Sequence, residues 1–158
     1  MRRIPRMATF IDAFKNVRGN PFDKLSISDL TSDRIRLERR ERLVIKEIRE
    51  TSSKQKALVK AGFGKDRTEQ RVLYRQIEQA DRQLKIGNLR LKRFSDELQV
   101  IDNFIFVAEN KKALEGTGLM QTLSRIPSDE LEDHLAQLSL RQSIADGNIE
   151  EVKSKLES

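Results

Sequence analysis

Apolar residues recur at alternating steps of four and three over one stretch of the chain, from residue 73 to residue 108. Steps of four and three place successive residues on one face of an α-helix, whereas a strand alternates every two residues. The stretch therefore predicts one long amphipathic helix. Its apolar seam comprises Leu73, Ile77, Ala80, Leu84, Gly87, Leu91, Phe94, Leu98, Ile101, Ile105 and Ala108.

The dipeptide Gly87-Asn88 lies in the middle of this repeat, although such a dipeptide usually marks a turn. A break in the helix would normally reset the phase of the repeat, and here the phase continues. We therefore predict one helix from about Lys65 to about Leu114, with Gly87 on the seam. A seam glycine costs on the order of 1 kcal/mol relative to alanine, and it permits close approach of an opposing helix.

A second repeat precedes this helix and supplies its partner. Apolar or small residues lie seven apart, and the intervening seam position is mostly polar, so this stripe is only half apolar. We expect a helix from about Ser28 to about Ala61, with Ser28, Asp29 and Ser32 as candidate caps. The seven-residue repeat is Leu30, Leu37, Val44, Thr51 and Leu58.

The stretch AGFGKD, residues 61–66, separates the two helices. Two glycines flank Phe63, and Asp66 can cap the helix that follows. Neither helix can bury its stripe alone, so we predict an all-α fold built on a long antiparallel hairpin over residues 28–115. If the turn centres on Phe63, Gly87 lies opposite the Leu37 to Glu41 region.

An amphipathic basic helix is predicted in the N-terminal segment, residues 1–22. Its apolar side chains can insert at a bilayer interface, and each basic residue near an anionic surface adds about 1 kcal/mol. The alternative is that this face packs on the hairpin as ordinary core. The candidate membrane-binding residues are Arg2, Arg3, Ile4, Arg6, Met7, Phe10, Ile11, Phe14, Lys15 and Arg18.

Residues 119–158 predict short acidic helices, over about 119–126, 128–145 and 149–158. The net charge changes sign along the chain, from +8 in residues 1–60 to −5 in residues 113–158. A basic front and an acidic back can attract each other between copies. The candidate self-assembly residues are Asp129, Glu130, Glu132 and Asp133.

Composition argues against catalysis. Charged residues make up 35% of the chain, and there is no Cys and a single His, His134, which we interpret as an exposed helix residue. Phosphate-binding loops and paired metal-ligand motifs are absent, so we expect no enzyme, no cofactor and no metal. No apolar run approaches the roughly 18 residues that a membrane span needs. We expect a cytoplasmic protein that binds membranes peripherally.

Four stretches together resemble the ESCRT-III superfamily, which includes the bacterial phage-shock protein PspA and the plastid vesicle-inducing proteins. MATFIDAFKNV is similar to the short amphipathic start of these proteins, and KALVKAGFGKD stands where their hairpin turn falls. The stretch from Arg75 to Leu114 resembles their second long helix running into the third, and SDELEDHLAQL resembles their acidic penultimate helix. The resemblance implies a homopolymer that remodels anionic membranes, and it implies other family members as further partners.

Two other functions fit the same residues. A small basic hairpin is also typical of coiled-coil adaptors that bind a protein partner in secretion or export systems. The basic second helix could contact nucleic acid, but Glu38, Glu41, Glu47 and Glu50 interleave with its basic residues and would repel phosphates. We therefore expect no nucleic-acid partner.

Overall fold

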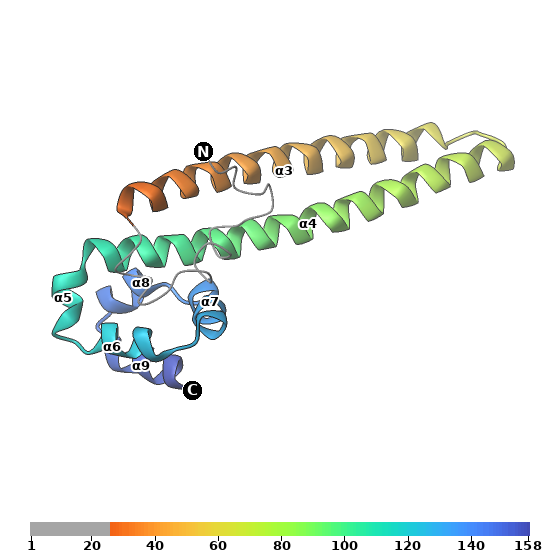
Figure 1. The fold of residues 1–158 in the computed structure, drawn as a ribbon. Helices are drawn as coiled ribbons and strands as arrows, with labels where there is room; N and C mark the ends of the chain where they lie inside the picture. Colours follow the sequence, from red (N-terminus) through yellow and green to blue (C-terminus); the bar gives the residue numbers. More distant parts are fainter. Residues whose placement is uncertain (1–25) are drawn as a thin grey trace. The chain divides into compact units, whose positions relative to one another are not determined.

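A computed structural model describes residues 26–158, and this part of the chain is all-α. Two long antiparallel helices, α3 (Ile27–Ala61) and α4 (Arg67–Glu109), pack as a hairpin (Figure 1). The predicted fold class is thus confirmed. The helices that follow are α5 (Lys111–Glu115), α6 (Leu119–Arg125), α7 (Ser128–Gln137), α8 (Leu140–Ala145) and α9 (Ile149–Glu157).

Helix α4 runs without interruption through Gly87 and Asn88, as the unbroken repeat predicts. The predicted end of this helix at Leu114 is wrong, because α4 stops at Glu109. Asn110 bonds the carbonyl of Phe106 twice, through its main-chain N–H at 3.0 Å and its side-chain Nδ2 at 2.9 Å. Such local side-chain bonding competes with helix continuation, and residues from Lys111 onward form the separate helix α5.

The caps of the two long helices differ in how well the sequence predicts them. Asp66 caps α4 as expected, since its Oδ1 accepts the N–H of Glu69 at 2.9 Å. At the start of α3 the expected caps are wrong. Ser26 takes that role, and its Oγ accepts the N–H of Asp29 at 3.1 Å.

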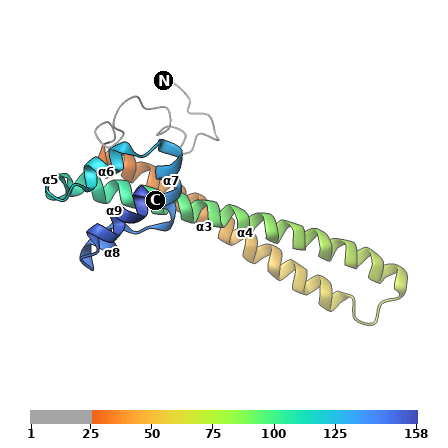
Figure 2. The same cartoon turned by 90° about the horizontal axis from the view of Figure 1, so that it is seen from below.

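The chain divides into two compact units. We call residues 38–95, which hold the turn and the adjoining parts of α3 and α4, the arm. We call the described residues 26–37 and 96–158 the base. In the arm the two helices run antiparallel to the turn (Figure 2). Val44 and Ala80 are the only buried side chains of the arm, and its remaining seam residues are partly exposed.

The register of the arm follows from contacts between its helices. Gln55 Nε2 donates to Asp81 Oδ1 at 2.6 Å, and Arg90 pairs with Glu47 at 3.6 Å. Gly87 lies against Ile48, so its predicted position opposite Leu37 to Glu41 is wrong.

The loop explains this error. Six residues follow Gln55 to the end of α3, but fourteen precede Asp81 from the start of α4. The helices are therefore not paired symmetrically about the turn. The loop instead continues beyond the end of α3 and runs beside the first turn of α4, where Gln70 Nε2 donates to the carbonyl of Gly62 at 3.3 Å (Figure 1).

The base contains most of the buried apolar side chains of the described residues. Within it α6 packs against α5 and α9, and α8 packs against α9. Helix α4 is buried on several faces here, in contrast to a surface helix with one apolar stripe. The largest side chains of this core with less than 2% exposure are Phe104, Leu30, Ile101, Leu119, Leu123, Leu131, Leu135, Leu140, Val100 and Val107.

The predicted continuous helix from Ser128 to Ala145 is wrong. Leu138 and Ser139 adopt extended backbone angles, which separate α7 from α8. Ser139 then caps α8, with its Oγ accepting the N–H of Gln142 at 3.4 Å. The sequence Ser139-Leu140-Arg141-Gln142 has the spacing of a capping box, which marks a helix start.

Candidate functional site

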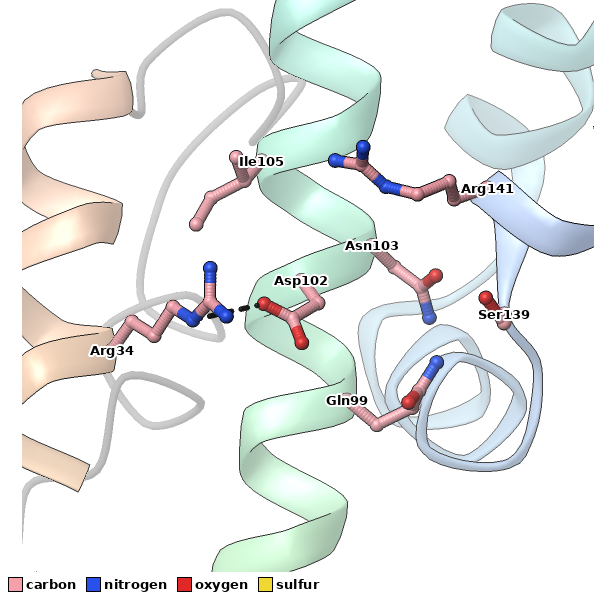
Figure 3. A pocket seen from close by; sticks show the side chains of 7 residues that line it. All are labelled: Arg34, Gln99, Asp102, Asn103, Ile105, Ser139 and Arg141. Carbon is pink, nitrogen blue, oxygen red and sulfur yellow. Dashed lines mark ion pairs between the residues drawn. The ribbon is translucent and has the colours of Figure 1, made fainter. Parts of the chain in front are cut away.

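A pocket of about 370 Å³ lies in the base, between α3, α4 and the α7–α8 connection (Figure 3). Two arginines reach into it from different helices, and one carboxylate, two amides, one hydroxyl group and one isoleucine line the rest. The lining residues are Arg34, Gln99, Asp102, Asn103, Ile105, Ser139 and Arg141.

Both arginines of the pocket have acidic partners. Arg34 Nε lies 3.3 Å from Asp102 Oδ1, and the two side chains face each other in Figure 3. Arg141 Nη2 lies 3.8 Å from Glu109, and its guanidinium stands 5.4 Å from the centre of the Phe106 ring. The positive charge of the pocket is therefore balanced locally.

Asn103 is the best-connected polar residue of this pocket, and it is buried. Its Nδ2 donates to the carbonyls of Leu135 at 2.7 Å and Leu138 at 2.6 Å, and its Oδ1 accepts the N–H of Leu140 at 2.9 Å. Gln99 adds a bond of 3.0 Å to the same Leu138 carbonyl. These main-chain groups lie at the end of α7 and the start of α8, where helices leave groups unpaired. Asn103 and Gln99 therefore hold the end of α7 and the start of α8 to α4.

The arm presents a different kind of surface. Several large apolar side chains are exposed on it, and they are scattered around both helices and the turn. Apolar side chains scattered singly are normal on a protein surface, so they do not by themselves mark an interface. These residues are Leu43, Val59, Phe63, Val72, Tyr74, Ile86 and Leu89.

The arm and the base carry net charges of opposite sign. The arm carries 17 basic and 8 acidic side chains, a net charge of +9. The described residues of the base carry 8 basic and 15 acidic side chains, a net charge of −7. The whole chain has a net charge of only +6, so this polarity is hidden in the composition.

The structure places the predicted site residues as follows. Those proposed to bind membrane, from Arg2 to Arg18, lie outside the described residues. The seam residues Leu73, Ile77, Leu84, Gly87, Leu91, Phe94 and Leu98 are partly buried along α4, and Ile101 and Ile105 are buried in the base. On α7, Asp129, Glu130 and Asp133 are exposed, whereas Glu132 and His134 are partly buried.

Sequence reasoning missed Asn103 and the charge of the arm. A polar residue inside the apolar run IDNFIFV is a usable signal for a buried amide, because an asparagine there needs hydrogen-bond partners. The charge of the arm emerges only once the boundaries of the two units are known, since they do not coincide with the turn or with helix ends.

No family model, curated protein or solved structure matches this chain. Among residues 26–158, no helix is long and apolar enough to cross a bilayer. The same residues contain no group of acidic and histidine side chains arranged to hold a metal ion.

Proposed function

We propose that this protein assembles into open filaments on anionic membranes and remodels them without catalysing a reaction. The observation that carries the proposal is the opposite charge of the arm and the base, +9 against −7. Two different surfaces of one chain that attract each other make a head-to-tail contact between copies. Such a contact gives a filament when its rotation does not close.

The thin packing of the arm supports the same proposal. The arm buries only two of its own residues, so a neighbouring copy would add burial that a single copy lacks. The membrane part of the proposal rests on the basic amphipathic sequence of residues 1–18. One such helix binds weakly, and a polymer that carries many copies multiplies its binding by avidity.

Electron microscopy of the purified protein tests this function directly. We expect filaments or coated tubes in the presence of vesicles that contain phosphatidylserine, and bare vesicles when only phosphatidylcholine is present. Raising the salt to about 1 M should dissolve the filaments, because charges are then screened within about 3 Å. A monodisperse monomer or dimer that ignores both vesicles would contradict the proposal, and so would a stable complex with one protein partner.

Two matched triple variants, one in the base and one in the arm, test the contact between copies. Neutralising Asp129, Glu130 and Asp133 as Asp129→Asn, Glu130→Gln and Asp133→Asn removes negative charge from the base, and we expect assembly to be lost. The control Glu50→Gln, Glu69→Gln and Glu78→Gln removes the same charge from the exposed surface of the arm, and should assemble at least as well. Circular dichroism checks that both variants fold. Equal assembly by both would exclude α7 as the contact.

Deletion of residues 1–18 tests the membrane anchor. We expect the shortened chain to form filaments in solution but to lose most of its sedimentation with phosphatidylserine vesicles. Unchanged vesicle binding would show that these residues are not the main anchor.

A further inference from the structure

The end of the arm, residues 54–75, is strongly basic, and we call it the tip. It contains seven basic and two acidic side chains, a net charge of +5 over 22 residues. The rest of the arm spreads ten basic and six acidic side chains over 36 residues. The tip therefore has few acidic residues to balance its positive charge.

Three arginines form a row on one face of α4 within the tip. Arg67, Arg71 and Arg75 are four residues apart and exposed, and they line a surface groove of about 610 Å³ together with Gln70, Tyr74 and one acidic residue, Glu78. Within residues 26–158, no acidic side chain pairs with any of the three. A row of unpaired guanidinium groups is suited to bind phosphate oxygens.

Apolar side chains accompany this row. Phe63, in the turn, is 78% exposed, the largest value among the exposed large apolar residues, and Val72 and Tyr74 are 52% and 62% exposed. A loop that carries an exposed phenylalanine among basic residues combines the two interactions of interfacial membrane binding, which are apolar insertion and attraction to anionic headgroups.

We propose that the tip is a second membrane contact, which inserts Phe63 into an anionic bilayer while Arg67, Arg71 and Arg75 bind lipid phosphates. This inference rests on the proposed function and adds a site that is separate from residues 1–18. An acidic surface of a second copy would satisfy the arginines but would not require an exposed phenylalanine. Double-stranded DNA would likewise offer phosphates without an apolar phase for Phe63.

The absence of tryptophan from the chain makes a clean reporter possible. The full-length variant Phe63→Trp has one tryptophan, at the tip. We expect its emission to shift to the blue on phosphatidylcholine vesicles that contain about one third phosphatidylserine, and to be quenched when the lipids carry brominated acyl chains. The control Leu89→Trp places the reporter at another exposed apolar position of the arm, and should show little quenching.

Sedimentation with the same vesicles separates failure of the tip from failure of the function. If Phe63→Trp sediments with vesicles but is not quenched, the tip proposal is wrong and membrane binding stands. A blue shift without quenching would mean that a second copy covers the tip, which also overturns the proposal. If the protein does not sediment at all, the proposed function itself fails.

The arginines are tested by Arg67→Gln, Arg71→Gln and Arg75→Gln together. We expect vesicle affinity to fall on the order of a hundredfold, since each basic residue near an anionic surface contributes about fivefold. The control Arg39→Gln, Arg40→Gln and Arg42→Gln removes the same charge from exposed positions away from the tip and should cost less than tenfold. If both triple variants lose vesicle affinity equally, the tip contributes only general electrostatic attraction and the proposal is wrong. If the tip variant loses affinity for duplex DNA but not for vesicles, the tip binds nucleic acid instead.

Discussion

The arm and the base are built from the same two long helices but are held together differently. In the arm, α4 buries one seam residue completely, Ala80, and leaves the rest partly exposed. In the base, most residues of α4 from Glu97 to Val107 are buried, because the short helices pack on its other faces. The base thus has a core with many buried side chains, whereas the arm is held by a narrow seam.

This difference indicates a division of labour. Helical segments draw most of their stability from tertiary packing, so a thinly packed arm is expected to open more readily than the base. A surface that gains packing when another molecule covers it is suited to assembly. The buried base would keep its shape while the arm makes and breaks contacts.

The largest expected effect comes from Asn103→Leu in the base. The change leaves the Leu135 carbonyl and the Leu140 N–H without their bonds to Asn103, while Gln99 still reaches the Leu138 carbonyl. Each buried group left unpaired costs about 1–3 kcal/mol, so we expect a loss of about 4 kcal/mol in the free energy of unfolding. Urea denaturation followed by circular dichroism measures it.

Asn88→Leu is the matched control for this change. Asn88 lies on the same helix but is exposed in the arm. We expect a change within about 0.5 kcal/mol. If the two asparagine variants lose similar stability, the contrast between base and arm is wrong.

The sequence predicts the structure of the arm better than that of the base. The arm is almost periodic, so the repeat through Gly87 predicts α4 and the hairpin without knowledge of any contact. The base is not periodic. There Asn103 bonds groups more than thirty residues away, and the break at Leu138 depends on those bonds and on the cap at Ser139.

The register of the hairpin shows a further limit of sequence reasoning. It depends on the path of the loop over residues 62–66, which shifts the pairing so that Gly87 meets Ile48. A glycine-rich loop has many paths of similar local energy. Pattern reasoning therefore finds the helices but not their offset.

Truncation of one leucine in each unit gives the next largest effect. Leu135 is fully buried in the base, so Leu135→Ala should cost about 3 kcal/mol from lost burial and the remaining cavity. Leu84 is partly exposed on the seam of the arm, so Leu84→Ala should cost about 1 kcal/mol. The same denaturation experiment compares them, and a larger loss at Leu84 would mean that the arm has the deeper core.

Gly87→Ala examines the close approach of the helices within the arm. A Cβ at this position would stand 2.8 Å from Ile48 Cγ1, closer than side chains pack, so Ile48 must move. The helix gains about 1 kcal/mol from alanine, but overpacking costs about 1–3 kcal/mol. We expect a net loss of about 1 kcal/mol.

A double-mutant cycle with Ile48→Ala isolates this contact. Without the Ile48 side chain nothing opposes the added methyl group, so Gly87→Ala should become stabilising by about 1 kcal/mol. A change of sign between the two backgrounds identifies the contact. If alanine destabilises both backgrounds equally, the loss arises elsewhere in the helix.

The smallest effect concerns Asp33, on the part of α3 that belongs to the base. Burial raises the pKa of this carboxyl above its ordinary value of 3.8, and the nearby Asp29 raises it further, although Arg36 at 3.6 Å opposes both. A raised pKa means that the folded state binds the proton more tightly than the unfolded state. Ionised Asp33 therefore opposes folding at neutral pH, and this effect disappears as the pH falls below 3.8.

Asp33→Asn should consequently be slightly more stable than the parent protein at pH 7, by no more than about 0.5 kcal/mol, and should lose that advantage in acid. Paired denaturation curves at the two pH values measure the change. Glu50→Gln is the control. Like Asp33, Glu50 forms an ion pair with a basic residue of its own helix, since its carboxylate lies 3.9 Å from Lys46 in the arm. A gain at Asp33 that persists in acid would point to packing rather than to ionisation, because only the ionised carboxylate carries the cost of burial.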